Sequence, residues 1–244
     1  MDTYEDMVAE RRVQICARMD DALSRAGRSS DDVTLVAVSK TVGTDEVVAA
    51  IRAGYRVFGE NRPQELVRKM GELGDRTGLP QVRFDMIGNL QTNKINAVLG
   101  RAALIHSIGS AHLAEAVSTR AARRIETGEL QSAVDVLLEV NVSGEETKSG
   151  FAPDEVRASM EHLMELSGIR IRGLMTMAPR GDKGAARATF SGLRELRDEL
   201  SSVYGIELPE LSCGMSEDFD IALEEGSTIV RLGRVVFDPA FALQ

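Results

Sequence analysis

The alternation of short apolar, β-branched segments with helical stretches constrains the fold of this chain more than any other feature. Eight strand candidates follow one another, at residues 33–38, 55–58, 82–87, 103–106, 134–140, 169–173, 209–212 and 228–232. Helical spacing of apolar residues fills the gaps, at 44–52, from Pro63 onward, and at 91–98, 110–127, 153–167, 184–203 and 217–224. Strands that alternate with helices pair in parallel, and eight such units predict a closed (β/α)8 TIM barrel.

A further helix is expected before the first strand, from Met7 to Ala26, where Gly27 stops it. The alternative architecture is an open, doubly wound sheet. That fold normally carries a GxGxxG turn after an early strand, and the sequence has none. No charged linker or low-complexity stretch divides the chain, so we predict one domain over residues 1–244.

The charge balance excludes several classes of partner. The chain has 29 Lys and Arg against 38 Asp and Glu, a net charge of −9, which repels nucleic acids and anionic membranes. The two cysteines are too few for a disulfide framework, and three scattered histidines predict no metal site. No signal peptide or membrane-length apolar run is visible, and no apolar stripe requires assembly. We therefore expect a cytoplasmic, monomeric protein.

Lys40 ends the first predicted strand, where functional groups of a parallel barrel gather. Partial removal of water from an ammonium there lowers its pKa and favours the neutral amine. A neutral amine is what Schiff-base formation with an aldehyde requires. The alternative is a lysine that reaches solvent from the end of the strand.

Two loops near the end of the chain have the composition of an anion site. Ser212-Cys-Gly-Met-Ser216 follows the seventh strand and offers backbone N–H groups and hydroxyls. Arg231-Leu-Gly-Arg234 follows the eighth, where Gly233 allows the backbone to approach a ligand closely. The phosphate site of such barrels is often built from these two loops. Each loop alone is also consistent with a simple turn.

Three other polar residues lie near predicted strand ends. Asn61 is either a ligand-facing amide beside Lys40 or the N-cap of the helix that opens at Pro63. His106 is expected to be a core or capping histidine rather than a base. Lys148 lies in a polar loop and is expected to be solvated. None of these positions identifies a reaction.

The motifs taken together resemble the pyridoxal phosphate homeostasis protein family, in matching order from about Ile15 to Phe237. The matching motifs are Leu35-Val-Ala-Val-Ser-Lys-Thr41, Phe58-Gly-Glu-Asn61 with Gln64-Glu65, Ile87-Gly-Asn-Leu-Gln-Thr-Asn-Lys94, His106-Ser-Ile108, Lys148-Ser-Gly150, Arg172-Gly-Leu-Met175, Leu211-Ser-Cys-Gly-Met-Ser216 and Gly226-Ser-Thr-Ile-Val-Arg-Leu-Gly233.

This resemblance implies a fold similar to the N-terminal barrel of alanine racemase. It implies that Lys40 carries pyridoxal 5′-phosphate (PLP) as a Schiff base. The other implied contacts are Ser216 and backbone groups of Met215, Gly233 and Arg234 to the phosphate, Arg231 to the pyridine nitrogen, and Asn61 near the ring. Arg234 departs from the family pattern, where Thr is usual, so its side-chain contact with phosphate is open.

We interpret the chain as a non-catalytic PLP carrier and buffer in intracellular vitamin B6 homeostasis, with PLP-dependent apo-enzymes as candidate recipients. A racemase needs an acid/base on each face of the substrate carbon, and similar enzymes use tyrosines. Residues Thr41 to Thr44, just after Lys40, contain no tyrosine, and the chain ends at Gln244 after the eighth strand. Tyr4, Tyr55 and Tyr204 are predicted away from the mouth. Three alternatives stay open: a minimal fold-type III PLP enzyme (an amino-acid racemase or decarboxylase), a cofactor-free Schiff-base aldolase, and an anion-binding scaffold.

Overall fold

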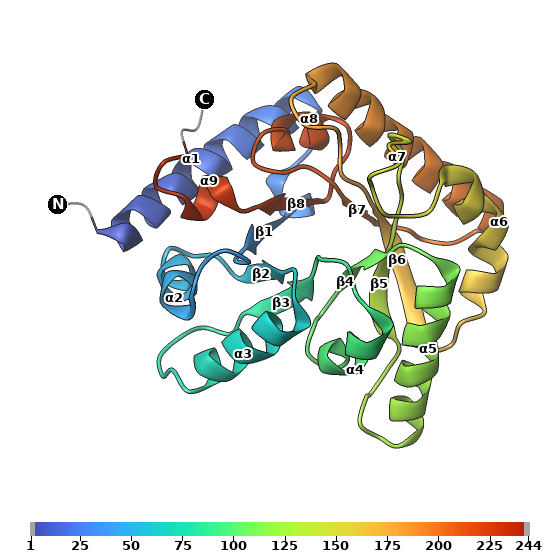
Figure 1. Ribbon diagram of the computed structural model, residues 1–244. Helices are drawn as coiled ribbons and strands as arrows, with labels where there is room; N and C mark the ends of the chain where they lie inside the picture. Colours follow the sequence, from blue (N-terminus) through green and yellow to red (C-terminus); the bar gives the residue numbers. More distant parts are fainter. Residues whose placement is uncertain (1–2, 242–244) are drawn as a thin grey trace.

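The computed structural model describes residues 3–241, in which eight parallel strands close into a barrel (Figure 1). The strands are β1 (Thr34–Val38), β2 (Val57–Glu60), β3 (Arg83–Met86), β4 (Ile105–Ile108), β5 (Val134–Glu139), β6 (Ile169–Met175), β7 (Glu210–Ser212) and β8 (Ile229–Leu232). Each strand pairs with the next, and β8 pairs with β1 so that Arg231 lies opposite Val36. The predicted (β/α)8 barrel is therefore confirmed.

Helices surround the barrel, one or more after each strand. They are α2 (Thr44–Arg52), α3 (Pro63–Gly74), α4 (Ile95–Val98), α5 (Ala111–Glu126), α6 (Pro153–Met164), α7 (Lys183–Tyr204), α8 (Phe219–Glu224) and α9 (Arg234–Phe237), with short 3-10 turns at Ser30–Asp32 and Thr92–Lys94. The turn at Thr92–Lys94 and α4 occupy the region predicted as one helix at 91–98. The four-residue helix α9, directly after β8, was not predicted.

The predicted N-terminal helix is confirmed as α1 (Tyr4–Arg25), which begins with a capping box formed by Thr3 and Asp6. This helix packs against α2, α8 and α9 (Figure 1). Two ion pairs, Arg18 with Asp220 and Arg25 with Glu224, join it to α8, each at 2.8 Å. α1 thus covers the seam where the first and last strands of the barrel meet.

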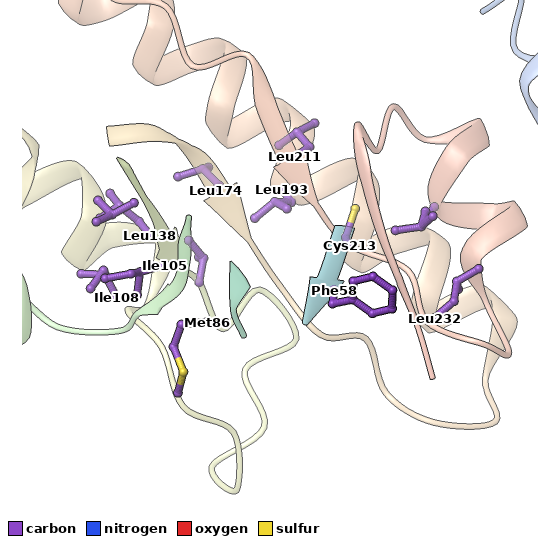
Figure 2. Packing of buried hydrophobic residues seen from close by; sticks show 14 of the residues in the cluster. Phe58, Met86, Ile105, Ile108, Leu138, Leu174, Leu193, Leu211, Cys213 and Leu232 are labelled. Atoms are coloured by element: carbon purple, nitrogen blue, oxygen red, sulfur yellow. The ribbon is translucent and has the colours of Figure 1, made fainter. Parts of the chain in front are cut away.

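Two apolar layers hold the barrel, one on each face of the sheet. Leu138 belongs to the larger cluster, which also contains residues of the surrounding helices, such as Leu193 of α7 (Figure 2). Its neighbour Leu137 belongs to a separate buried cluster contributed by strands around the barrel, together with Val36, Leu104, Met175 and Ile229. Alternate residues of a strand face opposite sides, so this second cluster forms an apolar layer inside the lumen.

Three strands differ by two residues from their predicted limits, and one of them is β6, which ends at Met175 rather than at residue 173. β2 begins at Val57 rather than at residue 55, since the N–H of Tyr55 closes the end of α2 on the carbonyl of Ala50. β4 spans Ile105–Ile108 rather than 103–106. The polar residues His106 and Ser107 predicted a strand end, but both are buried with partners, and Ser107 donates to the carbonyl of Gly88 at 2.6 Å.

Candidate functional site

Lys40 lies in a tight turn immediately after β1, at the C-terminal end of the barrel. The carbonyl of Ser39 accepts the N–H of Val42 at 3.1 Å, which makes Lys40 and Thr41 the central residues of the turn. The Lys40 side chain is exposed, and within residues 3–241 its ammonium makes no hydrogen bond or ion pair. The turn therefore presents an amine that the protein itself does not use.

The loops after β7 and β8 meet through a side chain. Ser216 is buried, and its hydroxyl accepts the N–H of Val235 at 3.3 Å, which joins the β7–α8 loop to α9. No hydrogen-bond acceptor for the N–H groups of Ser216, Gly233 or Arg234 is found between residues 3 and 241. Backbone donors without acceptors in adjacent loops form a concavity that suits an anion.

Barrel closure brings this concavity next to the end of β1. Ala37 pairs with Leu232, so Gly233 lies beside Val38, two residues before Lys40. A Cβ atom added to Gly233 would lie 3.4 Å from the Val38 side chain, which is van der Waals contact, so the two strand ends are in close proximity. The amine and the free donors therefore come from strands that are neighbours in space.

Met215 and the Arg234 side chain already have partners within the protein. The N–H of Met215 donates to Asp218 Oδ1 at 2.6 Å, and burial raises the pKa of Asp218 against the effect of this hydrogen bond. The Arg234 guanidinium pairs with Glu217 at 2.6 Å and lies over the Phe241 ring, 5.3 Å from its centroid. Within residues 3–241, the backbone N–H of Arg234 has no acceptor, so Arg234 can contribute to this site through that group.

Arg231 is buried in the lumen, at the end of a polar chain that crosses the barrel. Its guanidinium donates to Ser212 Oγ at 2.6 Å and to the carbonyl of Thr176 at 3.0 Å. His106 lies 3.0 Å from Ser212 through Nδ1 and 3.4 Å from Asp85 Oδ2 through Nε2. Residues of β3, β4, β7 and β8 thus meet in one network.

The protonation of this chain follows from its geometry. Burial lowers the pKa of His106, so the ring is neutral and carries one proton. Because the Ser212 oxygen accepts from Arg231, its own hydrogen is free to donate to Nδ1, which leaves the proton of His106 on Nε2 facing Asp85. Asp85 also pairs with Arg83 at 3.1 Å. From Arg231 through Ser212 and His106 to Asp85, each donor points to the next residue, and Arg231 is held in one orientation.

Asn61 follows β2 directly and packs closely on the next strand end. A Cβ atom at Gly88 would lie 2.3 Å from the Asn61 carbonyl oxygen, so only glycine fits there. The N-cap of α3 is Arg62, so the alternative interpretation of Asn61 as the N-cap is wrong. Its half-buried side-chain amide makes no hydrogen bond with any residue from 3 to 241. Asn61 is thus another polar group at this end of the barrel that is available to a ligand.

Two other expectations concern His106 and Lys148. His106 is a buried residue within β4, as expected of a core histidine. Lys148 is not a freely solvated lysine: its side chain is 18% exposed, and its ammonium lies 3.1 Å from both Glu145 Oε1 and the carbonyl of Met177. Lys148 therefore links the loop after β5 to the segment after β6.

The unpaired amine of Lys40 and the free N–H groups of the loops after β7 and β8 suit an aldehyde that carries a compact anion. An amine can attack an aldehyde, and free N–H groups can bind phosphate. The described part of the chain holds no group of three or more His, Cys, Asp or Glu side chains placed to bind a metal ion. None of its helices is long and apolar enough to cross a membrane.

Comparison with known proteins supports the resemblance found in the sequence. The alanine racemase N-terminal domain family matches residues 16–239. The pyridoxal phosphate homeostasis protein of Aquifex aeolicus is 40% identical over 229 residues, covering 93% of this chain and 96% of that protein.

The chain belongs to the pyridoxal phosphate homeostasis protein family.

Solved structures with related sequences share this fold. An unknown protein from Bifidobacterium adolescentis superimposes with a TM-score of 0.87 at 38% identity, covering 97% of each chain. PipY, from Synechococcus elongatus, has been solved with PLP bound. It superimposes with a TM-score of 0.79 at 33% identity, covering 94% of this chain and 99% of its own. The region matched to the alanine racemase N-terminal domain contains all seven residues predicted to contact PLP in this member of the pyridoxal phosphate homeostasis protein family.

Proposed function

We propose that this chain binds PLP at the C-terminal end of the barrel, through a Schiff base with Lys40. The observation that carries the proposal is the unpaired amine of Lys40 beside backbone N–H groups that have no acceptor within residues 3–241. The PLP bound to PipY supports the choice of ligand. Formation of the link joins the amine nitrogen to the aldehyde carbon and releases one water, so it is reversible by hydrolysis.

The phosphate would be bound by the Ser216 hydroxyl and by the N–H groups of Ser216, Gly233 and Arg234. Hydrogen bonds from neutral donors to a charged oxygen are each worth about 1.5–3 kcal/mol. The N–H of Met215 would contribute only by sharing its bond with Asp218. Arg234 would act through its backbone, since its side chain points to Glu217.

Arg231 and Asn61 would serve the ring. The chain of Ser212, His106 and Asp85 holds Arg231 in place, so that a guanidinium N–H can donate to the pyridine nitrogen. Arginine keeps its proton, so the ring nitrogen receives a hydrogen bond and no formal charge. A ring without that charge is a weaker electron sink, which favours storage of PLP over chemistry on it.

We infer a carrier and buffer of PLP rather than an enzyme, with PLP-dependent apo-enzymes as the recipients. A racemase needs a second acid/base opposite the lysine. In the described chain, Tyr4 donates to the carbonyl of Phe237, Tyr204 donates to the carbonyl of Arg157, and Tyr55 is buried before β2. None of these hydroxyls serves the end of β1. The names of the homeostasis relatives agree with this function. We further propose a monomeric, cytoplasmic protein with one domain.

An absorption spectrum with borohydride trapping tests the proposal. Protein mixed with PLP should absorb in the visible region, and the band should disappear on reduction. Peptide mapping should then find the pyridoxyl group on Lys40. A label on another lysine, or no label, would contradict the assignment.

Catalysis is tested separately on the same preparation. Amino acids incubated with the PLP-loaded protein in deuterated water should gain no deuterium at Cα and lose no carboxylate, as followed by NMR. Steady exchange or decarboxylation would instead identify a minimal fold-type III PLP enzyme.

A further inference from the structure

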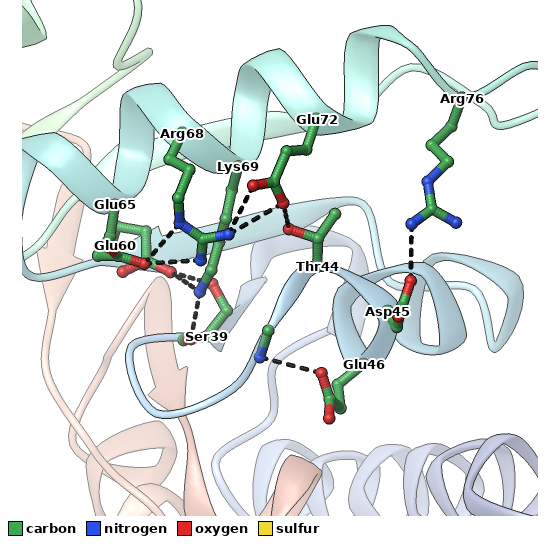
Figure 3. A network of polar contacts seen from close by, with 11 residues as sticks. Ser39, Thr44, Asp45, Glu46, Glu60, Glu65, Arg68, Lys69, Glu72 and Arg76 are labelled. Atoms are coloured by element: carbon green, nitrogen blue, oxygen red, sulfur yellow. Dashed lines mark hydrogen bonds and ion pairs between the residues drawn. The ribbon is translucent and has the colours of Figure 1, made fainter.

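A buried ion pair lies outside the barrel wall, between α3 and the ends of β1 and β2 (Figure 3). Lys69 of α3 places its ammonium 2.5 Å from Glu60 Oε1, and the two side chains are 1% and 0% exposed. Both charges are therefore removed from water. No ligand contact has been assigned to either residue.

The pair is bonded to the residue that precedes Lys40. The Lys69 ammonium donates to the carbonyl of Ser39 at 2.6 Å, and the Ser39 hydroxyl donates to Glu60 Oε1 at 2.6 Å (Figure 3). The same Ser39 carbonyl accepts the N–H of Val42 and so closes the turn that carries Lys40. Lys69 thus holds the acceptor on which that turn depends.

Stability alone does not explain these two charges. Removing an ion from water costs several kcal/mol, and a buried pair replaced by apolar residues is often as stable or more so. Glu60 Oε2 also has no hydrogen-bond partner among residues 3–241. An apolar pair would fill the same space without this cost, but it would leave the Ser39 carbonyl without its second donor. What the ion pair supplies is a fixed direction for the backbone.

We propose that Lys69 is a positioning residue, which sets the direction from which the Lys40 amine meets an aldehyde. Glu60 directly precedes Asn61, so the same pair also fixes the end of β2. A lysine side chain is flexible, so it does not fix the position of its own amine. The region that the amine can reach is set by the position and orientation of the backbone at Lys40. This inference rests on the proposed binding of PLP to Lys40.

The test compares PLP with pyridoxine 5′-phosphate, which has the same ring and phosphate but no aldehyde. The ratio of the two affinities isolates the contribution of the covalent link. In Lys69→Met this ratio should fall roughly tenfold or more, because a misplaced nucleophile loses effective molarity steeply. The affinity for pyridoxine 5′-phosphate should change little, since the phosphate donors lie on the loops after β7 and β8.

A double variant separates positioning from folding. Lys69→Met alone leaves the Glu60 carboxylate buried without a partner, which is strongly destabilising. Glu60→Gln with Lys69→Met removes both charges and should recover much of the thermal stability. The affinity ratio should stay low in the double variant. Recovery of the ratio together with stability would overturn the proposal and leave the pair a purely structural role.

Arg68→Met is the matched control. Arg68 is the preceding residue of α3, and it pairs with Glu65 and Glu72 (Figure 3). All three side chains are at least 37% exposed. Its removal changes the net charge equally and should leave the ratio unchanged, whereas an equal fall would overturn the proposal. If the unaltered protein shows no preference for PLP over pyridoxine 5′-phosphate, the proposed function fails. If it does and Lys69→Met keeps the ratio, only the positioning role fails.

Discussion

The two sides of the barrel mouth are supported in different ways. On the β1–β2 side, the buried ammonium of Lys69 donates to the carbonyl of Ser39 in the turn that carries Lys40, and it also pairs with Glu60. On the β7–β8 side, the loops are joined by a hydroxyl-to-backbone bond between Ser216 and Val235, and their free groups are backbone N–H donors. One side depends on charged side chains and the other mainly on backbone.

The difference reflects what each side would have to do. A covalent link needs one flexible side chain to arrive at one carbon in one direction, so its base must be rigid. A phosphate has several equivalent oxygens, so a loop with free N–H groups can bind it without a precise approach. Substitutions on the first side should remove the link and spare anion binding, whereas those on the second should weaken both.

Removal of the amine has the largest expected effect. Lys40→Ala should abolish the visible band and the borohydride label, because it removes the amine proposed as the nucleophile. Affinity for pyridoxine 5′-phosphate should be retained, as measured by calorimetry. The melting temperature should change little, since the Lys40 side chain is exposed and makes no polar contact within residues 3–241. A full label on the variant would show that another lysine carries PLP.

Ser216→Ala should have an intermediate effect, and on both ligands. Loss of a hydrogen bond to a charged group costs about 1–3 kcal/mol, which weakens PLP and pyridoxine 5′-phosphate alike, by roughly 5- to 150-fold. Arg234→Ala is the control from the same site. Its side chain makes a half-exposed ion pair with Glu217, so the binding free energy of either ligand should change by no more than about 1 kcal/mol. Unchanged affinity in Ser216→Ala would remove this residue from the phosphate site.

The barrel itself was predictable because its signal is repeated. Eight alternations of strand and helix tolerate errors of two residues at single boundaries, such as those at β2 and β4. At β2 the N–H of Tyr55 closes the end of α2, and at β4 tertiary contacts satisfy polar groups inside the strand. From the sequence alone, the polar residues His106 and Ser107 predict the end of a strand, because the sequence does not show the partners that bury them. Neither partner is close to them in the sequence.

The groups that face a ligand were easier to predict than the groups that hold them. Lys40 was located by the rule that functional groups follow strands, whereas Asp85 and Ser212 meet His106 only across the lumen. A signal for Lys69 was present: it lies three residues after the buried Leu66, on the apolar face of α3. A charge at an apolar helix position predicts a buried partner, but only the fold shows that the partner is Glu60.

The smallest expected effect concerns Glu139, the last residue of β5. It is 5% exposed, and its carboxylate makes no hydrogen bond with residues 3–241. Burial raises the pKa of Glu139, while the charge of Arg231 opposes this shift. The folded protein therefore holds this proton to a higher pH than the unfolded chain does. As pH rises above the ordinary range of glutamate, about 4.3, this side chain makes folding progressively less favourable until its raised pKa is passed.

Glu139→Gln cannot ionise, so the variant should escape that loss. Its melting temperature should equal that of the unaltered protein near pH 4 and exceed it at pH 7, by a few degrees at most, since roughly 2–4 °C corresponds to 1 kcal/mol for this size. Thermal unfolding followed across that pH range measures the difference. A variant that is less stable at pH 7 would mean that attraction between Glu139 and Arg231 outweighs burial. In that case both the Glu139 carboxylate and Ser212 would position Arg231. Buried side chains of the lumen would then fix the group proposed to contact the PLP ring, just as Lys69 is proposed to fix the turn that carries Lys40.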